Sequence, residues 1–261
     1  MKYLRPILIF AKEQALSCIF PVAIFATLAL SKTIDLPFLY RYDFILLVCV
    51  LVQIAMLYFK FETIDELKVI CLFHIIGLGL ELYKVHMGSW GYPEDAAFKI
   101  WRVPLYSGFM YASVASYICQ SWKRLKLQFS GWPQNVTTYA LSFTIYGNFF
   151  TKHFIPDVRW FIIAGLFVFF GKTKVAFTLD KKKYHMPVIL AFLLIGFFIW
   201  IAENISTFFG AWQYPDQAHA WQMVHFGKIS SWFLLVIISI IIVANLKKIK
   251  YPALVREKKD K

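Results

Sequence analysis

Charged residues are scarce in this chain. Only 16% of its 261 residues are charged, against about 25% in a typical soluble domain, while 59% are apolar, against about 45–50%. A disordered chain is excluded, because disorder goes with few apolar residues and much charge. A soluble globule of this size could not hide so much apolar surface, whereas helices surrounded by lipid need not hide it. The composition therefore predicts an all-α integral membrane protein.

Cysteine is also rare, and the motifs of several chemistries are missing. The four cysteines all lie in apolar stretches, and no His or Cys pair has the spacing of a metal site. We therefore interpret the thiols as small packing residues and predict neither a metal nor a cofactor. No small-residue cleavage site follows the N-terminal apolar run, so we expect that run to remain as a first span.

Long apolar runs are abundant. Crossing about 30 Å of hydrocarbon takes about 20 helical residues. Two of the eight candidate runs, 134–151 and 157–171, are weak because one is polar and the other short; the alternative for them is a re-entrant hairpin. The predicted spans are residues 14–31, 43–59, 67–88, 103–122, 134–151, 157–171, 186–209 and 222–245.

The net charge of +13 is distributed unevenly along the chain. If the N-terminus is cytoplasmic, twenty of the 28 Lys and Arg residues fall in cytoplasmic segments and six in outer ones, with seven and six acids respectively. Lys and Arg accumulate in cytoplasmic loops of membrane proteins. We therefore predict that both termini are cytoplasmic and that the basic residues contact membrane lipids, not nucleic acid.

One segment of the sequence occurs twice. Residues 81–94 read ELYKVHMGSWGYPE and residues 203–216 read ENISTFFGAWQYPD, at an offset of 122. The same offset relates most of the predicted spans in pairs. The repeat predicts a parallel duplication of four plus four spans, with residues 1–126 and 127–261 as its halves and a pseudo-two-fold axis along the membrane normal.

The glycines and aromatic residues of the repeat have a local interpretation. Gly88 and Gly210 follow the last turn of a predicted helix, where a left-handed cap favours glycine. Tryptophan and tyrosine side chains are stable at the membrane interface. Two helix ends anchored there would therefore explain the Gly, Trp and Tyr residues of the repeat. The alternative is that these rings contact a ligand; the candidates are Trp90, Tyr92, Trp212 and Tyr214.

Ionisable residues inside predicted spans are candidates for function. Glu81 and Glu203 each lie seven residues before the capping glycine, about 10 Å below the helix end. A charge at that depth is expensive unless it is paired or faces water. Structural ion pairs are the alternative, although desolvation makes them weak fasteners. The candidate catalytic residues are Glu81, Glu203, Lys84, His225 and Lys228, with Asn148 and Asn204 as further ligand contacts.

Around the first copy of the repeat, the chain has His74, Gly77, Glu81, Lys84, Gly88, Trp90, Tyr92, Pro93, Val103, Pro104, Gly108, Phe109, Met110 and Tyr111. This run resembles the YoaT-like family of bacterial integral membrane proteins, and the resemblance covers nearly the whole chain. That family has no established activity, so the resemblance implies a bacterial plasma-membrane location and no reaction. A second, weaker similarity, of single positions only, is to polytopic carotenoid hydratases.

Three functions fit this pattern. The first is an enzyme that uses a carboxyl group as acid or base on a lipid or isoprenoid in the outer half of the bilayer. The second is a proton-coupled transporter of a small solute, with titratable groups between two parallel halves. The third is a protein that only holds a hydrophobic small molecule. The one-sided position of the polar residues favours the first and third.

Overall fold

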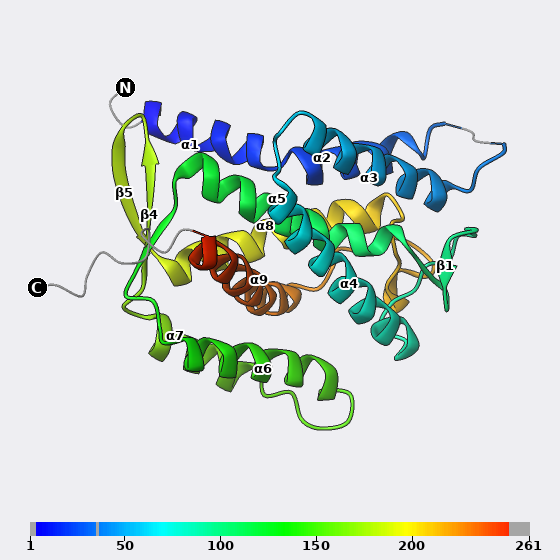
Figure 1. Ribbon diagram of the computed structural model, residues 1–261. Helices are drawn as coiled ribbons and strands as arrows, with labels where there is room; N and C mark the ends of the chain where they lie inside the picture. The colour runs from blue at the N-terminus through cyan, green and yellow to red at the C-terminus, as the bar shows by residue number, and fades with distance from the viewer. Residues whose placement is uncertain (1–3, 35–36, 251–261) are drawn as a thin grey trace, which may run out of the picture. The chain divides into compact units, whose positions relative to one another are not determined.

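The computed structural model describes residues 4–34 and 37–250, and most of this part of the chain is helical (Figure 1). Small antiparallel sheets interrupt the helices, so the fold is mainly but not purely α-helical. The elements are α1 (Leu4–Ser17), α2 (Ile19–Leu30), α3 (Arg41–Tyr58), α4 (Ile64–His86), β1 (Lys99–Ile100), β2 (Val103–Pro104), α5 (Tyr106–Leu125), β3 (Gln128–Ser130), α6 (Asn135–Thr151), α7 (Arg159–Phe170), β4 (Lys174–Leu179), β5 (Lys182–Pro187), α8 (Val188–Phe208), the 3₁₀ turn η1 (Pro215–Gln217) and α9 (Lys228–Lys250).

Several helices are long and apolar enough to cross a membrane. In the described residues these are α3, α4, α8 and α9, and a fifth if α1 and α2 form one span bent by 66°. The predicted fourth span corresponds to α5, whose buried side chains include Ser107, Ser116 and Gln120 and whose last turn is basic. The apolar helices mark a membrane protein, and the count of eight spans stays a prediction.

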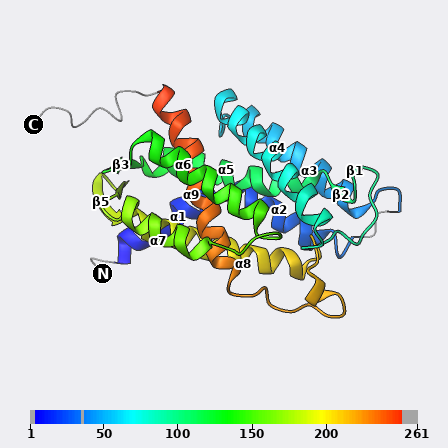
Figure 2. The same cartoon turned by 90° about the horizontal axis from the view of Figure 1, so that it is seen from below.

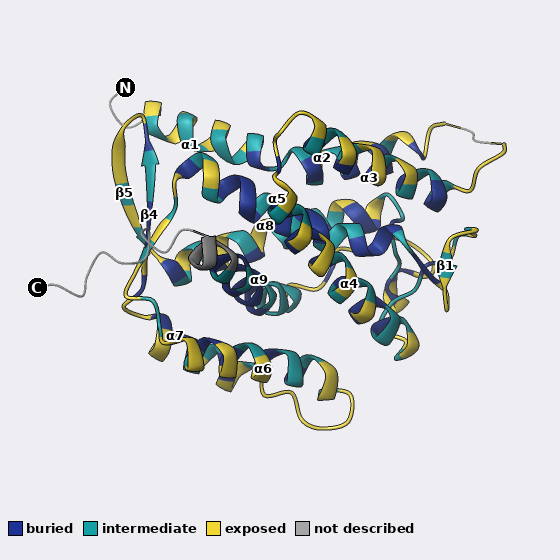
Figure 3. Cartoon of the chain, in the orientation of Figure 1, coloured by how far each residue is buried: buried dark blue, intermediate teal, exposed yellow. Residues whose placement is uncertain are grey.

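Helices α6 and α7 occupy the two weakest predicted spans. They contact each other, but they have only 17 and 12 residues. A helix of 12 residues covers about 18 Å, less than the roughly 30 Å of a hydrocarbon core. Apolar side chains such as Phe143, Phe161 and Val168 are exposed on this pair (Figure 3). The short lengths of α6 and α7 fit a re-entrant hairpin. The path of these helices through the membrane stays a prediction.

The segment after α7 forms strands, where the predicted spans 157–171 and 186–209 leave only a connecting segment with five Lys residues. Strands β3, β4 and β5 make one antiparallel sheet in which Phe177 pairs with Tyr184, and the two rings stack. Alternating apolar and polar residues favour a strand over a helix at this point. The offset of 122 would place the counterpart of α3 at residues 163–180, where the chain instead has the end of α7 and β4. The two halves of the sequence therefore differ here.

The chain divides into two compact units. Unit 1 takes its described residues from Met1–Glu13, Ser121–Trp200 and His225–Lys261, and unit 2 comprises Gln14–Gln120 and Ile201–Val224. The second copy of the repeat thus belongs to the same unit as the first. The predicted halves of the duplication, 1–126 and 127–261, do not coincide with these two units. The duplication stays a prediction about the ancestry of the sequence.

Three buried tyrosine rings form the centre of unit 2. Tyr42, Tyr92 and Tyr106 are 1%, 6% and 0% exposed, and their ring centroids lie 5.2–6.1 Å apart. Aromatic rings at these separations stabilise each other beyond simple burial. Because Tyr92 belongs to the loop after α4 and Tyr106 begins α5, this core fixes the repeat loop against its neighbours.

Candidate functional site

Helices α4 and α8 end in the same way. Gly88 and Gly210 both have a backbone φ of 68°, in the left-handed region. This conformation lets the next amide reach back five residues to a free helix carbonyl, which is the Schellman cap. The sequence prediction of two glycine caps is confirmed. The closing hydrogen bonds, both 2.9 Å, run from Ser89 N to Lys84 O and from Ala211 N to Ser206 O.

The two loops that follow these caps are joined directly. The amide of Gly91 donates to the carbonyl of Gln213 at 2.9 Å, and the amide of Gln213 donates to the carbonyl of Gly91 at 2.9 Å. The two residues are counterparts at the offset of 122. A contact in which each residue meets its own counterpart is typical of a two-fold axis. The pairing holds both copies of the repeat in one place within unit 2.

Glu81 lies in α4 and is only 5% exposed, yet its carboxylate is well supplied with donors. Oε2 accepts hydrogen bonds from Trp90 Nε1 and from the Tyr92 hydroxyl, both at 2.7 Å. Oε1 accepts from the Tyr111 hydroxyl of α5 at 2.8 Å. Three neutral donors around one carboxylate stabilise its charged form, because each presents a positive hydrogen.

Glu203, the counterpart in α8, is 3% exposed. Its Oε1 accepts a hydrogen bond of 2.5 Å from the hydroxyl of Tyr214, which lies 11 residues later, as Tyr92 does after Glu81. The ring of Tyr214 also meets the ring of Trp90 edge to face, with centroids 5.9 Å apart. We call Glu81, Glu203, Trp90, Tyr92, Tyr111 and Tyr214 the carboxylate cluster.

The tyrosine hydroxyls of the two loops act as donors in this cluster. Burial, and then the charge of Glu81, raises the pKa of Tyr92 well above its ordinary value. Burial, and then the charge of Glu203, raises the pKa of Tyr214 in the same way, and Glu81 adds to the effect. Both hydroxyls therefore stay protonated at any physiological pH. Lys84, one turn after Glu81, is 1% exposed, so the cluster also has a buried cationic residue beside it in the helix.

The other predicted site residues lie at different places. In unit 2, Asn204 accepts a hydrogen bond from the Val224 amide at 2.9 Å, and Trp212 packs against the core. In unit 1, Asn148 donates to Asp157 at 2.9 Å and so braces the turn between α6 and α7.

His225 and Lys228 also belong to unit 1. His225 Nδ1 accepts from the Gly227 amide at 3.0 Å, and Lys228 is the first residue of α9. That these two residues act with Glu203 stays a prediction.

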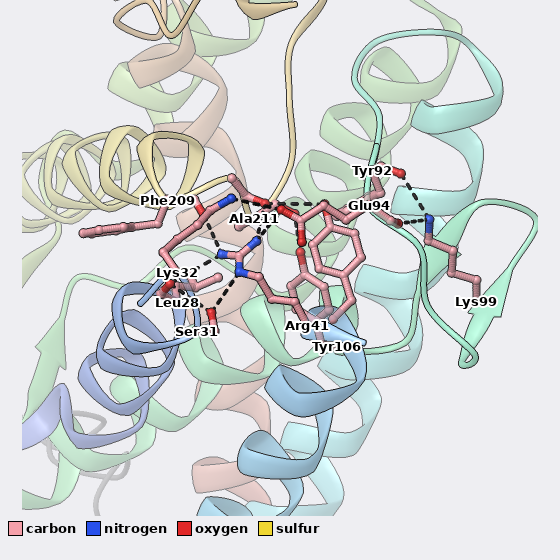
Figure 4. Close-up of polar contacts among 12 residues, drawn as sticks. Leu28, Ser31, Lys32, Arg41, Tyr92, Glu94, Lys99, Tyr106, Phe209 and Ala211 are labelled. Carbon is pink, nitrogen blue, oxygen red and sulfur yellow. Dashed lines mark hydrogen bonds and ion pairs between the residues drawn. The ribbon is translucent and has the colours of Figure 1, made fainter. Parts of the chain in front are cut away.

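Arg41, at the start of α3, supports the cluster, although no pattern in the sequence pointed to it. Its guanidinium donates to the carbonyls of Phe209 and Gly210 at 2.5 and 3.2 Å, to Ser31 Oγ at 2.9 Å and to Glu94 Oε1 at 2.8 Å (Figure 4). A cation at free helix carbonyls is favourable because the helix dipole is negative there. Arg41 therefore fixes the end of α8 in the orientation that the Gly91–Gln213 pairing requires.

Two further polar residues hold the first repeat loop. The buried carboxylate of Asp43 accepts from the amides of Ala97 and Phe98 at 2.7 and 3.1 Å. Lys99 Nζ donates to the carbonyl of Tyr92 at 3.2 Å. Their roles depend on contacts distant in sequence, and no local pattern marked them. Tyr111 was visible only among the residues that carry the family resemblance.

Residues 6–240 match the family described as "Protein of unknown function (DUF817)". The chain belongs to this family. It is also 57% identical over 250 residues to "Uncharacterized protein YoaT" of Bacillus subtilis (strain 168), covering 96% of this chain and 95% of that protein. The resemblance inferred from the repeat region is thereby confirmed. No solved structure matches the chain.

Proposed function

We propose that this DUF817 protein binds a lipid or isoprenoid at the carboxylate cluster and exchanges a proton with it. The observation that carries the proposal is the reciprocal Gly91–Gln213 pairing, because it brings two buried glutamates and their aromatic donors into one unit. An ionisable group in an apolar helix is expensive, and a pair of them is a functional-site candidate by default. The surrounding tryptophan and tyrosine rings suit a ligand with a large apolar part.

The two carboxylates have different parts in this proposal. Glu81 stays charged, because Trp90, Tyr92 and Tyr111 supply three donors. Glu203 exchanges the proton with the ligand, and the fixed charge of Glu81 stabilises the positive charge that develops when the ligand is protonated. Carboxylates in unlike surroundings divide their roles in this way in many acid–base enzymes.

The proposal includes a location and a topology. The protein is a multi-pass protein of the bacterial plasma membrane, with eight spans in a parallel four-plus-four duplication and with both termini cytoplasmic. The concentration of Lys and Arg in alternate loops supports this orientation. The matching glycine caps of α4 and α8 support a common origin of the two halves.

Reporter fusions test the topology. We expect fusions at Gly131 and at Gln217 to report opposite sides of the membrane, cytoplasmic for Gly131 and external for Gln217. A pair of reporters, one active only in the cytoplasm and one active only outside, gives the readout at each position. If both fusions report the same side, the eight-span topology is wrong.

Glu203→Gln tests the proposed chemistry. The amide keeps the shape of the side chain but does not exchange a proton at neutral pH, so we expect a folded protein without turnover. In cells, the extracted lipids should then contain accumulated substrate, which mass spectrometry would detect as a species absent from cells with the wild-type protein. The matched control is Asp180→Asn, which makes the same acid-to-amide change at an exposed side chain in the β4–β5 turn. Identical lipid profiles for wild type and Glu203→Gln would contradict the proposal.

Proton-coupled transport of a small solute is the second candidate. The observation that favours it is the burial of Lys84 one turn after Glu81 in α4, because titratable groups within apolar helices are typical of proton pathways. Proteoliposomes with an imposed pH gradient discriminate between the two. A transporter would accumulate solute inside the proteoliposomes when the pH gradient is present. The proposed enzyme would leave the internal solute content unchanged.

A further inference from the structure

The short hairpin between α4 and α5 has an unusual turn. Ile100 pairs with Val103, so Trp101 and Arg102 form a two-residue turn. Their φ angles are 44° and 76°, both in the left-handed region. Two-residue hairpin turns favour Asn-Gly or Asp-Gly, because other residues are strained at positive φ. A bulky aromatic residue and an arginine in this turn oppose the backbone preference.

The side chains of Trp101 and Arg102 are exposed and contact little of the rest of the protein. Trp101 is 84% exposed, and its neighbours Phe98 and Ile100 are 57% and 42% exposed. Arg102 is also exposed, and none of the ion pairs among the described residues includes it. Strain at an exposed turn with no internal contact to stabilise it points to a contact outside the chain.

The base of the hairpin, in contrast, is held firmly. Asp43 accepts the amides of Ala97 and Phe98, and the Leu105 amide donates to the Phe98 carbonyl at 3.0 Å. Val103 is fully buried in the core of unit 2. The hairpin therefore presents its tip on a rigid support.

The position of the hairpin indicates what the tip meets. Strand β2 contacts α4, and both views show the hairpin beside this helix (Figures 1 and 2). Val103 shares its core cluster with Leu82 and Val85, which lie in the last turns of α4. Because α4 is apolar and long enough to cross a membrane, a hairpin packed at its end lies at the membrane boundary.

We propose that Trp101 and Arg102 form an anchor for phospholipid headgroups at this boundary. An indole ring is most stable at the level of the headgroups, where its apolar face and its N–H are both satisfied. The guanidinium of Arg102 donates two parallel hydrogen bonds to a lipid phosphate, as arginine does at other phosphate sites. The lipid contact offsets the strain of the turn. This anchor is independent of the chemistry proposed for the carboxylate cluster.

Lipid quenching tests the contact of Trp101. The full-length protein is placed in bilayers that contain phospholipids brominated either near the headgroup or near the chain end. The fluorescence of Trp101 is the difference between wild type and Trp101→Phe. We expect the headgroup-proximal bromines to quench this difference more strongly than the distal ones. A Trp101 signal that neither lipid quenches would overturn the proposal.

Replacing the turn sequence tests whether the strained residues Trp101 and Arg102 gain stability from contact with lipid headgroups. The double variant Trp101→Asn with Arg102→Gly has the preferred turn sequence, so in a glycoside detergent without phosphate its melting temperature should rise by about 2–4 °C. In phospholipid bilayers the variant should lose this advantage, because only the wild type gains the headgroup contact. The matched control is Asp180→Gly in the β4–β5 turn, where φ is also positive and the side chain is an acid, which a lipid phosphate does not attract. This control should be stabilised equally in both media. Equal stabilisation of the double variant in both media would contradict the anchor.

Discussion

Glu81→Gln is expected to destabilise the protein substantially. The carboxylate accepts three hydrogen bonds, whereas the amide offers one oxygen and a nitrogen that only donates. At least one of Trp90, Tyr92 and Tyr111 then lacks an acceptor in a buried place. Each such donor costs about 1–3 kcal/mol. Thermal unfolding in detergent should show a melting temperature lower by roughly 2–4 °C for each kcal/mol lost.

A double-mutant cycle with Tyr111→Phe makes this prediction specific. Phenylalanine removes one donor and keeps the ring, so in the wild-type background it removes a hydrogen bond to a charge. In the Glu81→Gln background it removes a donor that has a poorer acceptor, and its effect should be smaller. The difference between the two effects measures the coupling of the two side chains. Additive effects would show that the Tyr111–Glu81 hydrogen bond contributes nothing.

Arg41→Ala should also lower the stability of the protein strongly. The guanidinium satisfies the carbonyls of Phe209 and Gly210 at the end of α8, and it is 12% exposed. A hydrogen bond from a charged donor is worth about 1.5–3 kcal/mol, so the loss of several should lower the free energy of unfolding by at least about 3 kcal/mol. Chemical unfolding of the purified protein measures this change.

Lys32→Ala is the matched control for Arg41→Ala. Lys32 also forms an ion pair with Glu94, at 3.0 Å, but its side chain is 43% exposed. Exposed ion pairs contribute about 0–1 kcal/mol, so this variant should be nearly as stable as wild type. Arg41→Lys should be intermediate, because one ammonium group cannot reach all the acceptors. If Arg41→Ala were as stable as Lys32→Ala, Arg41 would have no role in holding the end of α8.

The local features of the site could be predicted from the sequence. A glycine seven residues after a glutamate, at the end of an apolar run, indicates a left-handed helix cap, and both caps have that conformation at Gly88 and Gly210. The repeat also placed Glu81 and Glu203 at the same distance before their capping glycines, and each accepts a hydrogen bond from a tyrosine 11 residues later. These features depend on short stretches of chain.

The contacts between distant segments could not be predicted in the same way. The pairing of Gly91 with Gln213 needs no particular side chain, because it is made by backbone atoms. Arg41 looked like one of several outer basic residues, since its acceptors are carbonyls some 168 residues away. The strands β4 and β5 were missed because a stretch rich in lysine was interpreted only by its charge.

The central claim is that the carboxylate cluster binds a lipid or isoprenoid. Its most direct test is mass spectrometry of the lipids that remain with the purified protein after extraction in mild detergent. We expect one hydrophobic species to be enriched in the wild-type protein and also in Glu203→Gln, which binds the species but does not react with it. The species should be lost in Trp90→Ala, which removes one of the aromatic rings of the cluster. If the wild type carries only the bulk lipids of its membrane, in the same proportions as the Trp90→Ala variant, binding at the carboxylate cluster is contradicted.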